Sequence, residues 1–455
     1  MSVQRSKAEA AEAAHDDYSL ARVPAAARKH WFLIAIQRFG QTSALSQFVL
    51  GSTIGFCLKF WQAFWAVTLG AVVLEVVCIF VGIMGARQGL NTSLLARWSG
   101  FGSSGAALVG LACMLSLVGW FGIQSGVSAT GLYNIWHGIP IWVWSIVFGL
   151  LITVICVVGF NGMQWVANIT VPLFLILVAS SVIVELTKHN VSALISSPPP
   201  GAAMSIPAAA TLVAGGFMAG ATITPDMSRF NRKASDVVKQ TLVGITLGEY
   251  LICMSGVLLA HACKTADVTE IVIGSVGPIG IAIIVLGTAK INDWNLYASG
   301  LGVVNFIDVV FGKKTPRLVV TAILGVVGSV LAAVGILGHF TGFLNVLACV
   351  FPPIIGIEVA EYFFVKKWRP QLEEGREEGR LPATSPTWVP ATLVIWVIAA
   401  VVSYFWHWGL ASVNAIVLGF ALYLIVGLIP WTRRHVLVGF GETKSEQPTT
   451  VAAEA

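Results

Sequence analysis

Residues 103–130 read SSGAALVGLACMLSLVGWFGIQSGVSAT, a stretch without a single charged side chain. It belongs to a longer window, because no Asp, Glu, Lys or Arg occurs in the 87 residues between Arg97 and Glu185. Further uncharged windows of 40 and 52 residues follow Arg317 and Arg380. A helix needs about 20 apolar residues to cross a bilayer, so these windows alone hold about seven spans. The sequence therefore predicts an all-α integral membrane protein.

The composition supports this class. Of the 455 residues, 56% are apolar and 11% are charged, against about 25% charged in an average soluble domain. These values exclude a disordered chain, a nucleic-acid binder and an ordinary soluble enzyme. The net charge of +5 indicates no polyanionic partner. The seven cysteines include no CxxC pair, so neither a disulfide framework nor a zinc site is indicated.

We predict twelve membrane spans with both termini in the cytoplasm. In this arrangement 22 of the 27 Lys and Arg residues lie in cytoplasmic segments and three in outer segments, as the positive-inside rule requires. The predicted spans are 31–55, 61–84, 103–130, 139–160, 163–186, 207–225, 239–262, 272–308, 317–337, 340–365, 388–407 and 410–431.

The spans group into two candidate units of five, followed by two more. The Ala-rich N-terminal tail contains no apolar core of a signal peptide, and no soluble segment is long enough for a catalytic domain. The predicted parts are a cytoplasmic tail 1–30, a first repeat 31–186, a second repeat 207–365, a cytoplasmic loop 366–387, spans eleven and twelve at 388–431 and a cytoplasmic tail 432–455.

The first and sixth spans carry residues that favour a break in the helix. The first contains GQTS at 40–43, and the sixth contains Gly215-Gly216 and Gly220, then Thr224-Pro225. Backbone leaves the helix in a bilayer only where protein or a water-filled cavity satisfies it. Because these spans begin the two units, matching breaks indicate the central site of a transporter. Close helix packing through small residues is the alternative.

Lys290 is the least expected residue, because it lies deep in the eighth span. A charge at the bilayer centre costs about 2.5–3.5 kcal/mol, so the side chain should face the bundle interior and have a partner. Asp293, three residues on, lies on the same helical face. Two interpretations stay open: an ion pair that only locks the span, or a cation or proton site.

Other residues within the spans carry smaller predictions. Arg38 is near enough to the end of the first span for its side chain to reach the membrane interface, and we expect it to do so. Glu75 and Glu249 either pair with Arg38 or stay protonated. The long eighth span has room for a break, and Pro352-Pro353 predicts a kink in the tenth.

Trp120 and Gln124 stand one helical turn apart in the third span. An indole beside an amide that both donates and accepts suits a flat heteroaromatic ligand. Phe217, beside Gly216 in the sixth span, could cover the other face of such a ring. By itself this pattern is weak, because most of the 16 Trp and 24 Phe residues serve packing or the membrane interface.

Taken together, the sequence resembles the nucleobase:cation symporter-1 family, particularly its bacterial cytosine permeases. The resemblance implies the five-plus-five inverted-repeat fold of sodium-coupled amino-acid transporters, with two trailing helices. It also implies a flat base held between aromatic residues of spans three and six. The likeness is carried by Val23-Pro24, Ala27-Arg28-Lys29, Leu94-Leu95-Ala96-Arg97, Val118-Gly119-Trp120-Phe121-Gly122, Asp226 with Arg229-Phe230, Asn292-Asp293 and Leu296–Gly302.

The resemblance also assigns roles to single residues. Trp120 and Phe217 would stack on the two faces of the base, and Gln124 matches an amide of the related hydantoin transporter. Cytosine permeases have a glutamine where this chain has Leu117 and a serine where it has Gly216, which argues against cytosine itself. The predicted substrate-binding residues are Ser43, Trp120, Gln124, Gly216, Phe217, Gly220, Asn292 and Asn295.

The predicted coupling site departs from the family pattern. The family's sodium site combines span-one carbonyls, here near Gly40 and Ser43, with two hydroxyl residues, here Lys290 and Ile291. Neither side chain supplies the oxygen that sodium requires. We predict that the Lys290 ammonium occupies the sodium position, with Asp293 beside it. Transport would then be proton-coupled or uncoupled, and no metal or organic cofactor is expected.

The predicted function is import of a nucleobase, cytosine or a purine, across the cytoplasmic membrane by alternating access. The expected partners are a small planar heterocycle and the lipid bilayer, and a monomer is sufficient. A hydantoin- or allantoin-type heterocycle is the alternative within the same fold. A channel is the alternative of a different class, although polar residues cluster at the breaks rather than along a pore. No nucleophile–base pair or metal cluster indicates an enzyme.

Overall fold

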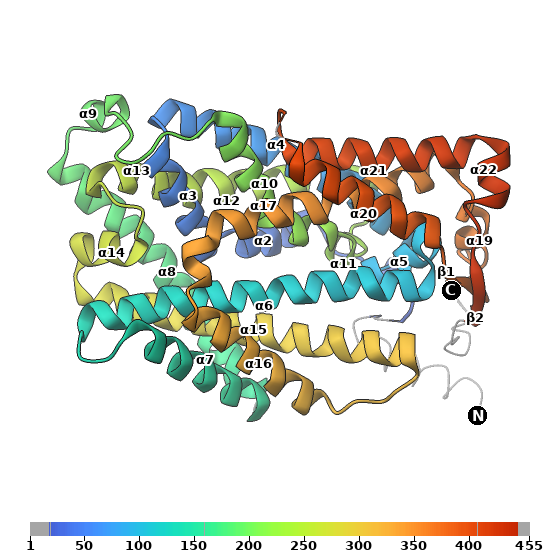
Figure 1. Cartoon of the computed structure of the whole chain (residues 1–455), viewed down its shortest axis with the longest axis horizontal. Coiled ribbons are helices and arrows are strands. Elements are labelled where there is room, and N and C mark those ends of the chain that lie inside the picture. Colours follow the sequence, from blue (N-terminus) through green and yellow to red (C-terminus); the bar gives the residue numbers. More distant parts are fainter. Residues whose placement is uncertain (1–17, 19, 159, 407, 445–455) are drawn as a thin grey trace.

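The computed structural model describes residue 18 and residues 20–158, 160–406 and 408–444, with side chains except those of 158, 160–171 and 290. Helices dominate the described chain (Figure 1). Its helices and helical turns are η1 Ala25–Ala27, α2 Trp31–Thr42, α3 Leu45–Cys57, α4 Phe60–Gln88, α5 Thr92–Ala96, η2 Arg97–Phe101, α6 Gly102–Ile135, α7 Ile141–Val158, α8 Phe160–Lys188, α9 Val191–Ser196, α10 Ile206–Thr222, α11 Pro225–Ser228, α12 Ala234–Gly248, η3 Glu249–Cys253, α13 Met254–Cys263, α14 Val268–Val276, α15 Pro278–Phe311, α16 Arg317–Ala333, η4 Ile336–His339, α17 Phe340–Val350, α18 Pro352–Val359, η5 Ala360–Val365, α19 Arg369–Glu373, α20 Pro390–Phe405, α21 Ala411–Leu428 and α22 Pro430–His435.

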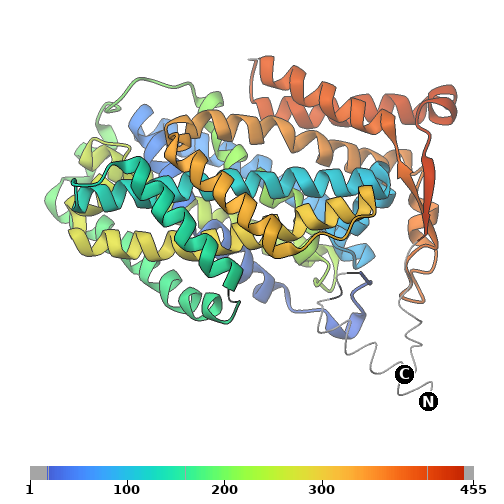
Figure 2. The same cartoon turned by 60° about the horizontal axis from the view of Figure 1, so that its bottom comes forward.

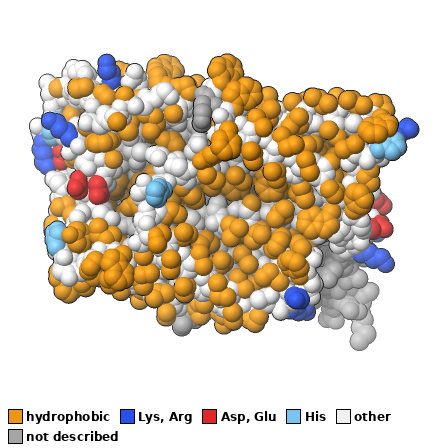
Figure 3. All heavy atoms as spheres, viewed as in Figure 1, with side chains coloured by type: hydrophobic (Ala, Val, Ile, Leu, Met, Phe, Trp, Pro, Cys, Tyr) orange, Lys and Arg blue, Asp and Glu red, His pale blue; other side chains and the backbone are white. Residues whose placement is uncertain are grey.

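The surface of the bundle is apolar between its ends. Figure 3 shows hydrophobic side chains over the visible face, with charged side chains toward the two ends. By length and composition, six helical segments of the described chain are able to cross a membrane, and five shorter apolar helices accompany them. The count of twelve spans stays a prediction. The six segments are Phe60–Gln88, Thr92–Ile135, Ala234–Cys263, Pro278–Phe311, Ile336–Val365 and Ala411–Leu428.

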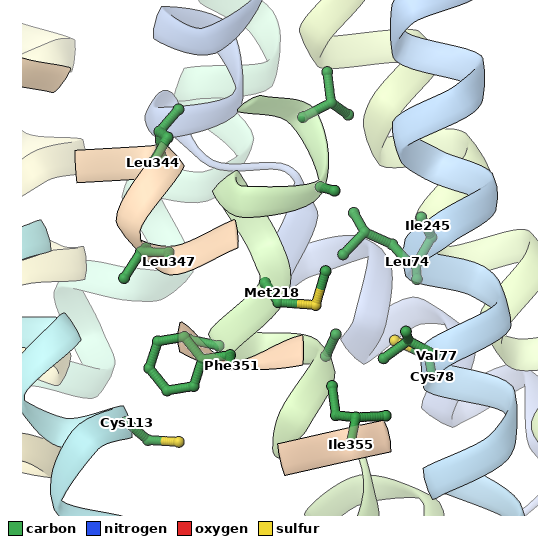
Figure 4. Close-up of a cluster of buried hydrophobic side chains, with 14 of the residues drawn as sticks. Leu74, Val77, Cys78, Cys113, Met218, Ile245, Leu344, Leu347, Phe351 and Ile355 are labelled. Carbon is green, nitrogen blue, oxygen red and sulfur yellow. The ribbon is translucent and has the colours of Figure 1, made fainter. Parts of the chain in front are cut away.

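Helices of the two candidate units pack on one another reciprocally. The first-span helices α2 and α3 pack against α12 and α13 of the seventh span, and α10 of the sixth packs against α4 of the second. In the same way α6 packs along α15, and α7 packs on α16. Figure 4 shows α10 in the middle of this core, with Met218 near Val77 and Cys78 of α4 and with Leu344 and Leu347 of α17 on its other side.

The first span is broken at the predicted place. The helix α2 ends at Thr42 and α3 begins at Leu45, which leaves Ser43 and Ala44 between them. The Ser43 N–H still bonds to the Phe39 carbonyl at 2.7 Å, whereas Ala44 is extended with φ −115° and ψ 156°.

The sixth span is broken too, but not at its glycines. The helix α10 runs through Gly215, Gly216 and Gly220 and ends at Thr222, so the break lies at Ile223–Thr224. Pro225 explains this position, because proline lacks an N–H and its ring clashes with the carbonyl four residues earlier. The glycines instead allow close packing: a Cβ atom on Gly215 would lie 2.2 Å from the Leu344 carbonyl oxygen.

The other two predicted interruptions are also present. Gly277, at φ +77°, separates the short helix α14 from α15, and α15 itself is continuous from Pro278 to Phe311. The predicted eighth span therefore combines the end of α14 with α15. In the tenth span, α17 ends at Val350 and α18 begins at Pro352, as the double proline predicts.

One end of the bundle gathers α5, α11, α19 and a two-stranded sheet, and we call it the terminal end; the end with α9 and α14 is the distal end (Figure 1). The strands β1 Thr384–Trp388 and β2 Phe440–Lys444 pair antiparallel, and α20 and α21 lie side by side at the edge of the bundle (Figure 2). Arg22 is buried there and donates to the carbonyls of Gln88 and Leu372 at 2.7 and 2.5 Å. Burial lowers the pKa of Arg22 to about 10.

Candidate functional site

The helix α6 runs from one cavity to another, and the two cavities lie near opposite ends of the bundle. The distal cavity has a volume of about 260 Å³ and is lined by Val127 and Thr130 of α6, with Val49, Asp267 and Phe340. The terminal cavity has a volume of about 200 Å³ and is lined by Cys113 and Met114 of α6, with Thr92, Ile223 and Asp226. From residue 114 to residue 127 a helix rises about 20 Å. The stretch of α6 between the cavities carries Trp120 and Gln124.

Trp120 is buried against the tenth span. Its ring meets Phe343 edge-on, with centroids 5.3 Å apart, and meets Phe340 at 6.1 Å. Gly119 allows this contact, because a Cβ atom there would lie 2.4 Å from the Phe343 ring. The indole is therefore held rigidly between the two cavities, with only 8% of its surface exposed.

Gln124 has spare hydrogen-bonding capacity. Its side chain is 3% exposed, and its amide oxygen has no hydrogen-bond partner among the described residues. A buried polar atom without a partner costs about 1–3 kcal/mol. Such atoms are rare in folded proteins, and one beside a rigid indole is a group that a bound ligand can satisfy.

Asn292 and Asn295 both lie on α15. The Asn292 amide donates to the Phe121 carbonyl at 3.0 Å and to the Ser125 hydroxyl at 2.9 Å. The Asn295 amide donates to Asn292 at 3.4 Å. The structure therefore brings Asn292 to the part of α6 that carries Gln124 and ties the third span to the eighth through it, whereas the Asn295 amide bonds within α15.

Three predicted site residues of α10, Gly216, Phe217 and Gly220, are placed by contacts with the first span and with one another. Gly216 faces α3, since a Cβ atom on it would lie 3.1 Å from the Leu50 side chain. Phe217 is partly buried, and the guanidinium of Arg38 lies 5.5 Å from its ring centroid. Gly220 keeps room for this ring, because a Cβ atom there would lie 2.7 Å from Phe217. The sandwich of a base between Trp120 and Phe217 stays a prediction.

Arg38 does not reach the membrane interface, so that expectation is wrong. The side chain is 1% exposed. It donates to the Thr224 hydroxyl at 3.0 Å and to the Gly220 carbonyl at 3.4 Å, besides Gln41 on its own helix. The break in the sixth span offers free carbonyl and hydroxyl groups within the protein, and these replace the water that a snorkelling arginine would seek.

The predicted coupling site is only partly described. The Lys290 side chain lies outside the described residues, and Asp293 is buried in α15 with its backbone carbonyl accepting from the Cys156 thiol at 3.6 Å. Gly40 is exposed with open space around it. Ser43 is 6% exposed, and its hydroxyl has no partner among the described atoms.

The two intramembrane glutamates have neutral partners. Glu75 accepts from the Thr246 hydroxyl at 2.7 Å, and Glu249 accepts from the Gln47 amide at 2.9 Å. Gln47 was missed in the sequence analysis. An amide in an apolar stretch is a weak signal, and the 202 residues that separate it from Glu249 hide the contact. Among the described residues, no group of three or more His, Cys, Asp or Glu side chains could hold a metal ion.

Comparison with known proteins decides the family. A model of the family described as "Permease for cytosine/purines, uracil, thiamine, allantoin" matches residues 22–427. The chain belongs to this permease family. It is 31% identical to the cytosine permease of Escherichia coli K12 over 91% of this chain and 95% of that protein. It is 25% identical to the hydantoin permease of Microbacterium maritypicum over 76% and 73% of the two chains.

The fold of this permease also matches solved structures. Inward-facing Mhp1 aligns with a TM-score of 0.76 at 19% identity, covering 91% of this chain and 93% of Mhp1. Mhp1 in a closed conformation with bromovinylhydantoin bound, described as a nucleobase-cation-symport-1 family transporter, aligns at 0.68. The chain is thus a multi-pass membrane protein and a secondary transporter, and its relatives are permeases rather than enzymes.

Proposed function

We propose that this permease imports a nucleobase, cytosine or a purine, by alternating access. The observation that carries the proposal is the position of Trp120 and Gln124 on α6, between the distal and terminal cavities. A ring stacked on the indole would lie about midway through the bundle, where each cavity could in turn connect it to one side of the membrane. The buried Gln124 oxygen would then accept from an N–H or amino group of the ring.

The sixth and eighth spans complete this site in our proposal. Phe217 covers the second face of the ring, and Gly216 leaves room for it. Asn292 and Asn295 orient its edge. Hydantoin- or allantoin-type rings are the second candidate class, since Gln124, Leu117 and Gly216 depart from the cytosine permease pattern and the hydantoin permease is a relative.

We also propose the arrangement in the cell. The terminal end faces the cytoplasm of an inner-membrane protein with twelve spans, because 22 of 27 basic residues fall in the segments assigned to that side. The reciprocal packing of α2–α3 on α12–α13 and of α10 on α4 supports an inverted repeat. Lys290 takes the position of the family's sodium ion, so the transport is driven by protons rather than sodium.

Uptake into proteoliposomes tests the function. Labelled cytosine, uracil, adenine, hypoxanthine, allantoin and hydantoin are each supplied with and without sodium, under an imposed pH gradient. We expect saturable uptake of at least one ring that a pH gradient drives and sodium leaves unchanged. Uptake that sodium stimulates would refute the proton proposal, and non-saturable uptake would favour a channel.

The stacking model is tested by Trp120→Ala. Loss of the indole should weaken binding by about 100-fold, which is about 2.7 kcal/mol and near the upper end of base–aromatic stacking. Trp61→Ala is the matched control, because Trp61 is 56% exposed on α4. Binding is measured by a thermal-shift assay whose readout does not use tryptophan fluorescence, and by competition with a labelled ring. Near-normal affinity in Trp120→Ala would remove the model.

A further inference from the structure

Gln47 and Glu249 form a buried pair beside the first break. Gln47 lies in the first turn of α3, and Glu249 begins the π-helical turn η3 of the seventh span. The Gln47 Nε2 group donates to Glu249 Oε1 at 2.9 Å. Gln47 is 3% exposed and Glu249 is fully buried, so water does not compete for this bond.

Each side chain of the pair has one oxygen atom without a hydrogen bond among the described atoms. Gln47 Oε1 and Glu249 Oε2 have no hydrogen-bond partner among the described atoms. The free amide oxygen points toward α10, where it lies 4.0 Å from the position of a Cβ atom on Gly216. Gly216 is a residue of the proposed substrate site, so the pair presents one polar edge to that site.

Few helices bring titratable side chains near Glu249. η3 packs against α3, α4, α12 and α13. Most of the titratable groups brought near it have partners of their own: Glu75 accepts from Thr246, Tyr250 pairs with Thr68, and Arg38 donates to the sixth-span break. The titratable groups that interact electrostatically with Glu249 are Glu75 of α4 and Cys253 of its own turn. Among the described residues, the group whose hydrogen bonding changes with the protonation of Glu249 is therefore the neutral amide of Gln47.

An amide has a donor end and an acceptor end, whereas a carboxyl changes its role with its proton. Ionised Glu249 only accepts, so Gln47 must turn its NH₂ toward it and its carbonyl toward Gly216. Protonated Glu249 can donate its O–H to the Gln47 carbonyl. The amide then turns over about its last torsion, which is roughly two-fold, and its NH₂ faces Gly216.

We propose that Gln47 and Glu249 form a proton-linked amide switch that couples substrate to the driving proton. The proposal rests on the proposed function. The substrate class is a ring with an acceptor edge, a carbonyl oxygen or an unprotonated ring nitrogen, next to Gly216. Binding such a ring favours the state with Glu249 protonated. One proton passes from water to the Glu249 carboxylate for each ring bound, no covalent bond of the substrate changes, and the proton leaves when the ring leaves.

The primary test measures proton uptake on binding. The purified protein in weakly buffered detergent solution receives in turn each ring of the panel (cytosine, uracil, adenine, hypoxanthine, allantoin and hydantoin), and an indicator dye reports protons taken up. The wild type is expected to take up as much as one proton per ring. The affinity should fall by up to about tenfold per pH unit on the alkaline side, as linkage of one proton requires. Infrared difference spectra should show a protonated carboxyl band that the bound ring strengthens.

Two variants assign the effect to the pair. Glu249→Gln cannot ionise and can donate its NH₂ to the Gln47 carbonyl at any pH, so it should bind the ring with a pH-independent affinity near that of the wild type at low pH, without proton uptake. Gln47→Leu should lose the pH dependence and most of the affinity. Glu185→Gln is the matched control, because Glu185 pairs with Lys188 at the end of α8 and should leave proton uptake unchanged.

The outcomes separate this inference from the function. If the wild type binds no ring of the panel, the proposed function fails. If it binds rings without proton uptake, or if Glu249→Gln keeps the wild-type pH dependence, the function stands and the switch is overturned. Should Glu249→Gln not fold, the infrared band of the wild type decides, because a ring that leaves this band unchanged contradicts the switch.

Discussion

The two helix breaks of this permease differ in how fully their polar groups are used. At the break in the sixth span, backbone N–H groups from Ile223 to Asn231 bond to carbonyls within the same turn. Thr224 accepts from Arg38, and Asp226 accepts from the Thr92 N–H at 2.8 Å. At the first break, the hydroxyl of Ser43 and the amide oxygen of Gln47 have no partner among the described atoms.

This difference indicates that the breaks in the first and sixth spans, which look alike in the sequence, have different functions. At Ile223–Thr224 the backbone N–H groups and the Thr224 hydroxyl are bonded, so this joint is held firmly, although farther along Ser228 Oγ and both side-chain polar atoms of Asn231 have no partner among the described atoms. A free hydroxyl at the break itself, as on Ser43, is instead available to a ligand. Arg38 connects the two, since it lies on α2 just before the first break and donates to the second. The substrate is therefore expected to contact the first break directly and to influence the second through Arg38.

Removing the connection should have the largest effect. Arg38→Met keeps the length of the side chain but leaves Gly220 O and Thr224 Oγ1 without their donor. The loss should lower the free energy of unfolding by about 2–4 kcal/mol and abolish transport, measured by thermal unfolding in detergent and by uptake. Arg87→Met, at an exposed arginine, is the control and should change stability by less than about 0.5 kcal/mol. Wild-type uptake in Arg38→Met would mean that the two breaks work independently.

Loss of the single hydrogen bond between Arg38 and Thr224 at the second break should have a smaller effect on stability. Thr224→Val keeps the shape and removes the acceptor for Arg38, which should cost about 1.5–2 kcal/mol without changing the affinity of the substrate. Thermal unfolding and ligand titration measure the two effects separately, with Thr187→Val at an exposed position as the control. Weaker substrate binding at unchanged stability would place the second break in the binding site rather than in the scaffold.

The smallest change in stability is expected at the first break. Ser43→Ala removes a hydroxyl that has no partner among the described residues, so unfolding should shift by less than about 0.5 kcal/mol. Substrate affinity should fall by about 2- to 12-fold, which corresponds to one neutral hydrogen bond. The comparison of the breaks is contradicted if Ser43→Ala destabilises the protein as much as Thr224→Val while the affinity stays the same.

Local chemistry explains which predictions from the sequence succeeded. The kink before Pro352 depends on prolines that act on their own backbone, and the first break falls at the end of the GQTS stretch that predicted it. For the eighth span only the length indicated room for a break, and the structure places it at Gly277, whose φ of +77° suits glycine. Of the residues that indicated a break in the sixth span, Pro225 sets its position and the glycines do not, because glycine permits a break without requiring one, whereas proline enforces it. Arg38 was placed wrongly because its partners, Gly220 and Thr224, lie more than 180 residues away in the chain.

The sequence by itself determined that the chain is a helical membrane protein of a recognisable transporter family, because long uncharged stretches and family motifs are properties of the linear chain. Only the tertiary structure decided which intramembrane polar groups meet. It paired Gln47 with Glu249, turned Arg38 inward and left the Gln124 oxygen free between two cavities. In an apolar bundle a buried polar atom must find its partner on another helix, and the partner is chosen by packing rather than by position in the chain.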